Sequence, residues 1–158
     1  MRKLLLVIFL VMGCAKVTHH NLPDVPYSPI PPEGAYANPR PIIYEQWWEQ
    51  TEKCSHLKGN LKKVKFFLVP EDVPLGFTYR GDILLGLWIW PHYIFIAQTH
   101  EYDSLVVRHE MLHSLLGKGG HPKEYFCGLC KGVVIADCLY YVPPNLNDKI
   151  VPPEAERW

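Results

Sequence analysis

The sequence lacks several features that would point to particular partners or architectures. Its 16 Lys and Arg residues balance its 16 Asp and Glu residues, so no excess of charge favours nucleic acid or another anionic polymer as a partner. No internal repeat is visible, and 158 residues leave room for one domain. The N-terminal apolar run, Leu4–Met12, is far shorter than the roughly 20 residues that a membrane-spanning helix needs.

The first 14 residues instead have the organisation of an export signal. Arg2 and Lys3 precede the apolar run, and the small residue Gly13 follows it. The four residues from Val11 to Cys14 resemble the lipobox of bacterial lipoproteins, which implies cleavage before Cys14 and acylation of that residue. An ordinary secretory signal with an incidental Cys14 is the alternative.

A lipid on Cys14 would hold the protein in the cell envelope, outside the cytoplasm, with the rest of the chain in water. Ala15 follows the cysteine where an aspartate would resemble an inner-membrane retention signal, so the outer membrane or periplasm of a Gram-negative cell is favoured. Prolines are then frequent up to Pro41, which is typical of an extended tether. We therefore expect a signal peptide at 1–13, a tether at 14–41 and one domain at 42–158.

Four cysteines remain after Cys14, and an even number in an exported chain favours two disulfides. Three pairings are possible. We expect Cys54–Cys130 with Cys127–Cys138, because a bond between adjacent turns within Cys127-Gly-Leu-Cys130 would constrain little. A thioredoxin-like redox pair and a four-cysteine zinc site are alternatives that the sequence leaves open.

Hydrophobic periodicity and turn residues predict a small α+β domain with an N-terminal helix, a short twisted sheet that includes a hairpin, and a second helix. The first helix should stop at Gly59-Asn60, and Lys62–Pro70 alternates as a strand does, with Val64, Phe66 and Leu68 on one face. The further expected elements are a loop at Glu71–Asp82, hairpin strands at Ile83–Trp90 and Tyr93–Gln98, a helix from Asp103 to Gly117, a short helix at Pro122–Phe126, a strand or buried segment from Gly132, and a loose tail from Asn145.

The helix expected at Asp103–Gly117 carries His109 and His113 one turn apart. At about 100° per residue their directions differ by only about 40°, so both imidazoles can converge on one point. Glu110 lies beside that point, and an apolar stripe that includes Leu105 and Leu112 would bury the helix. Two neutral imidazoles and a carboxylate within reach of water are what zinc-dependent hydrolysis requires.

These residues, in the sequence HEMLH, resemble the HExxH motif of the zincin metallopeptidases. The resemblance implies that His109 and His113 bind zinc and that Glu110 is the general base. The chain is not a standard metzincin. That subgroup has the pattern HExxHxxGxxH, whereas here the glycine comes one residue late and the histidine, His121, two residues late, and no methionine follows for a Met-turn.

Zinc in a catalytic site usually has three protein ligands and one open position. His121 is the first candidate for the third ligand, because Gly117, Gly119 and Gly120 allow a sharp reversal that could return it to the metal. Asp137 is an acidic alternative. Gluzincins use a glutamate from a later helix, and Glu124 lies too close to the motif to match it.

The predicted function is therefore a membrane-anchored, zinc-dependent peptidase that acts on a peptide or protein, with Glu110 as catalytic base and His109, His113 and His121 as metal ligands. The alternatives are a lipid-anchored binding or assembly module whose metal is structural or absent, and hydrolysis of a non-peptide amide or cell-wall cross-link. The sequence indicates neither the oligomeric state nor the cleavage specificity.

Overall fold

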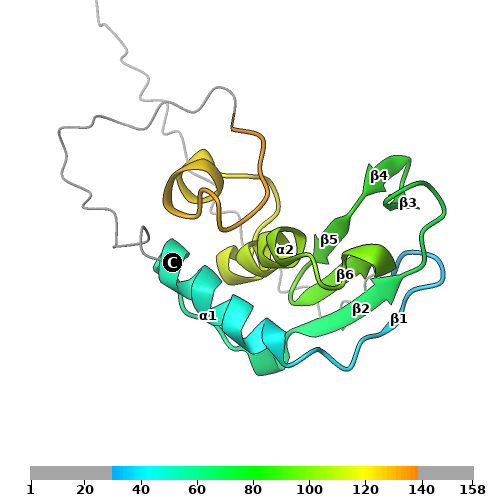
Figure 1. The fold of residues 1–158 in the computed structure, drawn as a ribbon, viewed down its shortest axis with the longest axis horizontal. Helices are drawn as coiled ribbons and strands as arrows, with labels where there is room; N and C mark the ends of the chain where they lie inside the picture. The colour runs from blue at the N-terminus through cyan, green and yellow to red at the C-terminus, as the bar shows by residue number, and fades with distance from the viewer. Residues whose placement is uncertain (1–29, 139–158) are drawn as a thin grey trace, which may run out of the picture.

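The structure, a computed structural model, describes residues 30–138, and these form a small α+β domain (Figure 1). Four strands make one sheet in the order β1-β2-β6-β5, and a separate pair is formed by β3 and β4. The elements are β1 Tyr36–Ala37, α1 Ile43–Ser55, η1 Leu61–Lys63, β2 Lys65–Val69, β3 Phe77–Tyr79, β4 Asp82–Leu84, β5 Gly86–Ile89, β6 Tyr93–Ala97, η2 Gln98–His100, α2 Ser104–Leu116 and η3 Glu124–Leu129.

Strand β2 lies inside the sheet and is covered on both faces. It pairs in parallel with β6 and antiparallel with β1. The predicted alternation is confirmed, because Val64, Phe66 and Leu68 pack against the two helices. The opposite face of the sheet packs against residues of β3 and β4 and includes Phe67 and Val69. Burial on both faces explains the nearly continuous apolar sequence of this strand.

Helix α1 packs an aromatic face against the sheet. Tyr44, Trp47 and Trp48 are buried there, because their spacing places them on one side of the helix. The helix ends earlier than expected, at Ser55 rather than near Gly59. His56 takes the left-handed conformation at φ 57° and terminates it. The glycine therefore misled the boundary prediction, because a histidine occupies the cap.

Residues 71–90 correct two further expectations. Part of the expected loop forms β3, which pairs with β4, and the expected strand Ile83–Trp90 is divided at Leu85 between β4 and β5. Only β5 makes the predicted antiparallel hairpin with β6. In Figure 1 the β3–β4 pair lies next to β5, near the arrowhead of β2. Strand β5 is the last strand in the order of the four-stranded sheet and is therefore an edge strand.

The beginning of the domain lies within the stretch predicted as a tether. Tyr36 and Ala37 form β1, and the Asn38 side chain is buried and donates to Glu101 Oε1 at 3.1 Å. The folded domain therefore starts before Ile42. The export signal, Cys14, the tether up to Pro29 and the expected tail from Asn145 lie outside the described residues.

Helix α2 begins and ends as predicted. The Asp103 carboxylate accepts from the backbone N–H groups of Leu105 and Val106, and Gly117 takes the left-handed C-cap conformation at φ 63°. The helix is buried through Val106, Val107, Met111 and Leu112. The sequence predicts Leu105 on the buried stripe, but this prediction is wrong, because Leu105 is 39% exposed.

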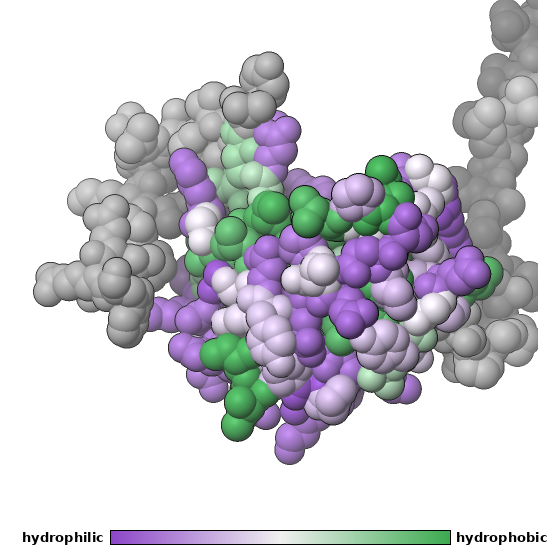
Figure 2. Space-filling model, turned by 45° about the vertical axis from the view of Figure 1, so that its right-hand side comes forward, coloured by the Kyte–Doolittle hydropathy of each residue, from purple (hydrophilic) through white to green (hydrophobic). Residues whose placement is uncertain are grey.

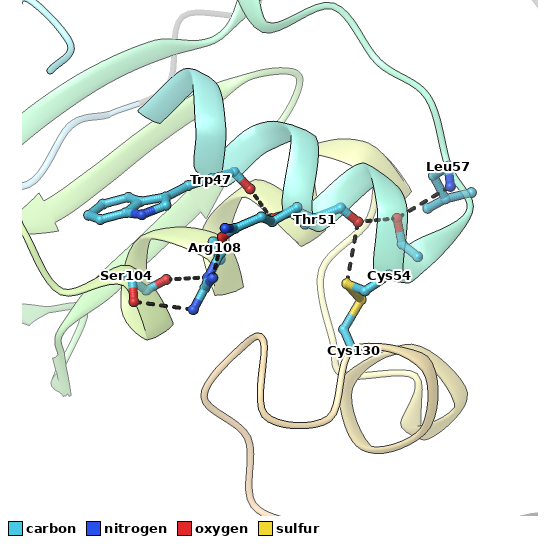
Figure 3. Close-up of a disulfide and its surroundings, with 9 residues drawn as sticks. Trp47, Thr51, Cys54, Leu57, Ser104, Arg108 and Cys130 are labelled. Carbon is cyan, nitrogen blue, oxygen red and sulfur yellow. Dashed lines mark hydrogen bonds between the residues drawn. A yellow bond between two sulfur atoms is a disulfide. The ribbon is translucent and has the colours of Figure 1, made fainter. Parts of the chain in front are cut away.

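Helices α1 and α2 are tied together by polar contacts as well as by the shared core. Figure 3 shows Arg108 of α2 beneath α1, where its guanidinium donates to the backbone and hydroxyl oxygens of Ser104 and to Gln50 Oε1. Burial lowers the pKa of Arg108 from its usual range. These contacts fix the helix that carries the HEMLH motif against its neighbour.

Two disulfides stabilise the segment after α2: one attaches it to α1, and the other closes a loop within it. They pair Cys54 with Cys130 and Cys127 with Cys138, which confirms the predicted connectivity. Figure 3 shows the first of these bonds joining the end of α1 to the coil that follows α2. That coil, η3, is a wide π-type helix that extends beyond the short helix expected at Pro122–Phe126. After it, residues 132–138 contain an isolated bridge at Val134 rather than a strand.

Within residues 30–138, no helix is both long enough and apolar enough to span a membrane. The face drawn in Figure 2 carries its hydrophobic residues as separate patches among hydrophilic ones. Single exposed apolar side chains of this kind are ordinary on a protein surface.

Candidate metal site

Three histidine side chains converge beside α2. The Nε2 atom of His109 lies 3.2 Å from that of His113 and 2.9 Å from that of His121. The possible ligand atoms of all three lie within 4.8 Å of one another, and no carboxylate joins this group among residues 30–138. Two imidazole nitrogens at about 2.0–2.1 Å from a tetrahedral zinc ion lie about 3.3 Å apart. The three nitrogens therefore suit a single small metal ion.

The chain reversal that returns His121 to the helix uses glycines, as the sequence predicted. Gly117 and Gly120 have positive φ angles of 63° and 76°, which glycine adopts without steric cost. Of the proposed third ligands, His121 lies at the site. Neither Glu124 nor Asp137 belongs to the group of three, although Asp137 lines a surface hollow together with His109 and His121.

Backbone carbonyls orient the two helical histidines. His109 Nδ1 lies 2.6 Å from the Ile135 oxygen, and His113 Nδ1 lies 3.2 Å from the Lys118 oxygen. A carbonyl can only accept, so each Nδ1 carries the proton and each Nε2 keeps a lone pair for a metal. Second-shell partners of this kind are usual for metal-binding histidines.

Electrostatics keep these rings neutral. Burial lowers the pKa of His109 to about 4, against an opposing effect of the Ile135 carbonyl. Burial and the neighbouring His109 likewise lower the pKa of His113 to about 4, and burial lowers the pKa of His121. Neutral imidazoles are the form that binds a metal ion.

An aromatic side chain forms the floor of the site. The Phe126 ring centroid lies 4.9 Å from those of His109, His113 and His121, and Phe126 is 1% exposed. Trp88 of β5 stacks on His113 from another side, at 6.1 Å between centroids. Packing on these rings restricts the imidazoles to a few orientations.

Glu110 is buried between α2 and the edge strand. Its carboxyl and Cγ lie so close to Gly86 that a Cβ there would come within 2.7 Å of Oε1 and 2.8 Å of Cγ. Burial raises the pKa of Glu110 to about 8, although a hydrogen bond from the Trp88 backbone opposes the shift. The side chain is therefore held against β5, and its charged form is disfavoured in the absence of a nearby cation.

Sequence reasoning missed the groups that support the histidines. Phe126, Trp88 and Gly86 were not singled out, because each contacts the motif across a long sequence separation. The carbonyls of Lys118 and Ile135 have no sequence signal, since every residue carries one. The glycine-rich turn pointed to His121, and the HEMLH motif pointed to His109, Glu110 and His113.

Comparisons with protein-family models, with curated proteins and with solved structures gave no match for this chain.

Proposed function

We propose that the protein is a zinc-dependent peptidase, with His109, His113 and His121 as zinc ligands and Glu110 as general base. The observation that carries the proposal is the convergence of three neutral imidazoles, with a buried carboxylate on the residue that follows the first of them. Nitrogen ligands in a compact group of three favour zinc over magnesium or calcium, which prefer oxygen.

The number of ligands supports catalysis over a structural role. Structural zinc sites normally have four protein ligands, whereas catalytic sites have three and leave one position for water or substrate. Within residues 30–138 the candidate group has only the three histidines. Zinc held by these three histidines would supply Lewis acidity for a carbonyl oxygen and would make water more acidic.

Glu110 would remove the proton from the attacking water and later give it to the leaving amine. Its pKa of about 8 lies near neutral pH, where one group can both take up and return a proton. A cation beside Glu110 would lower that value and favour the carboxylate form needed at the start of the reaction. Contact with Gly86 fixes where the carboxyl oxygens lie.

An extended peptide could bind along β5. This strand pairs with β6 only, so backbone groups on its other edge can pair with a further strand, apart from the Trp88 N–H, which donates to Glu110. Because Gly86 at the start of β5 contacts Glu110, a peptide on this edge would run beside the proposed base. Pairing of this kind requires a substrate with an extended peptide backbone. It therefore favours peptides over other amides as substrates.

The proposed location is the cell envelope, with a lipid on Cys14 as the anchor. Two disulfides agree with an oxidising compartment, where such bonds form and persist. Labelling with a fatty-acid analogue in a bacterial host, with Cys14→Ser as control, tests the anchor.

The decisive experiment replaces Glu110 by Gln and measures peptide hydrolysis together with zinc content. We expect about 10²–10⁴-fold slower hydrolysis, the range that a general base contributes, with one zinc ion still bound. Glu124→Gln is the matched control, because Glu124 is an exposed carboxylate close to the motif and outside the metal group. Wild-type activity of the Glu110 variant would refute the mechanism.

A further inference from the structure

Beside the metal-binding histidines lies a hollow that the proposed mechanism does not use. It measures about 230 Å³, and His109 and His121 form one side of it. Phe126, Cys127 and Ala136 make up its apolar wall. The hollow therefore lies between two of the candidate metal ligands and residues of η3 and the segment that follows.

The wall of the hollow is fixed in place. Phe126 and Cys127 are 1% and 4% exposed, and the Cys127–Cys138 disulfide closes the short loop that contains Ala136. Because its sulfur is in a disulfide, Cys127 offers a nonpolar surface and no reactive thiol. A rigid hollow next to the reacting centre can select among side chains by size and polarity.

Charge at the hollow favours neither cations nor anions. Lys123 and Asp137 line it, and both residues are exposed. Their opposite charges offset one another, so a charged side chain would gain no consistent attraction and would lose water against Phe126. An apolar side chain has no such penalty and gains from burial.

The volume sets the size of the side chain. With roughly 30 Å³ for each water molecule, the hollow holds about seven or eight waters. A side chain of about four to seven heavy atoms displaces a similar number, which describes leucine, methionine and phenylalanine.

From this geometry we propose that the hollow formed by Phe126, Cys127 and Ala136 is a specificity pocket, and that the substrates are peptides with a large apolar residue next to the cleaved bond. The inference rests on the proposed peptidase function. Ala136 is the residue that determines the depth of the pocket, because a longer side chain at this position would fill it.

The test uses zinc-loaded protein and synthetic hexapeptides of alanine in which one central residue is Leu, Phe, Asp or Lys. Cleavage by the wild type is mapped by mass spectrometry. Binding of the same peptides to the Glu110→Gln variant, which should hold them uncut, is measured by fluorescence anisotropy. We expect the Leu and Phe peptides to be preferred over the Asp and Lys peptides by at least about tenfold in both assays.

Ala136→Phe should abolish this preference, and Ala136→Val should reduce it, while zinc content stays unchanged. Ala37→Phe, at an exposed alanine of β1 outside the hollow, is the matched control and should retain it. Thermal unfolding of each variant verifies folding, and the smaller valine variant serves if phenylalanine prevents it.

Different results distinguish the two proposals. Cleavage without preference, or a preference that survives both Ala136 variants, overturns the pocket and leaves the peptidase standing. Selective binding that Ala136→Phe abolishes, without cleavage of any peptide by the wild type, supports the pocket and overturns the hydrolysis.

Discussion

The three candidate ligands come from two regions that differ in how firmly they are held. His109 and His113 belong to α2, where Ile135 and Lys118 carbonyls orient them and His113 is only 6% exposed. His121 belongs to the loop after α2, is exposed, and has no Nδ1 hydrogen-bond partner among residues 30–138. We call these the helix half and the loop half of the site.

The helix half is therefore held by more contacts than the loop half, although His121 already lies 2.9 Å from His109. We expect the His121 side chain to lose more conformational freedom than the other two when a metal binds. Ordering a flexible side chain reduces the free energy of metal binding, whereas a side chain that is already ordered in the folded protein has no such cost.

Replacing a ligand should separate the two halves most strongly. His113→Ala should lower zinc affinity by more than about 100-fold, beyond the 10–100-fold typical of second-shell changes. It should also destabilise the metal-free protein by about 1–3 kcal/mol, because it leaves a space beside Phe126 and Trp88. His121→Ala should also weaken zinc binding, but it should change the metal-free stability by less than about 0.5 kcal/mol.

Chelator competition measures the affinities, and denaturant unfolding of the metal-free proteins measures the stabilities. Equal destabilisation by the two variants would show that the loop half is as well packed as the helix half, contrary to the comparison.

The two disulfides should contribute differently: the longer one mainly to stability and the shorter one mainly to metal affinity. In the chain-entropy model, Cys54–Cys130, with a separation of 76 residues, stabilises by about 4.5 kcal/mol, and Cys127–Cys138, with a separation of 11, by about 2.8 kcal/mol. The shorter bond, however, closes the segment that presents the Ile135 carbonyl to His109.

Paired Cys→Ser variants at each bond are compared in urea unfolding and in zinc competition. We expect the Cys54/Cys130 variant to lose more stability and the Cys127/Cys138 variant to lose more zinc affinity, by about 10–100-fold. A larger loss of affinity on opening the longer bond would show that η3, rather than Ile135, supports the helix half.

The extent to which the sequence predicts this site follows the same division. The helix half was predictable because its information is local. Asp103 and Gly117 mark the ends of α2, and the four-residue spacing of His109 and His113 sets their directions. The return of His121 was predictable only as one of several alternatives, because a glycine-rich turn permits many paths and the sequence does not select one.

The parts that could not be predicted depend on contacts between distant segments. Strand β1 has two residues in a proline-rich stretch, and it forms because β2 offers an edge. The β3–β4 pair divided an apolar run that looked like one strand. Gly86 has no motif of its own, yet the space it leaves accommodates Glu110. Such roles are visible only when the chain is folded.

Changing Gly86 should affect catalysis without affecting the metal. In Gly86→Ala the new Cβ would lie within 2.7 Å of Glu110 Oε1, so the carboxylate must move. We expect hydrolysis to fall by about 10–100-fold, as for a misplacement of about 1 Å, with zinc affinity within about threefold of the wild type. Gly119→Ala is the matched control, because no atom lies within 4 Å of its Cβ.

Unchanged hydrolysis in Gly86→Ala would mean that the reaction tolerates a displaced Glu110 carboxylate. A parallel fall in zinc affinity would mean instead that Glu110 and the histidines move as one unit.

Removing the cap of α2 should change stability alone. Asp103→Ala removes the acceptor for Leu105 and Val106 N–H and should destabilise the protein by about 1 kcal/mol. Asn60→Ala, at the cap of the three-residue η1, is the control and should have a smaller effect. Zinc affinity should match the wild type in both variants, because packing against α1, β5 and Phe126 holds the histidines once the protein is folded. A tenfold loss of affinity in Asp103→Ala alone would instead assign the rigidity of the helix half to its capped N-terminus.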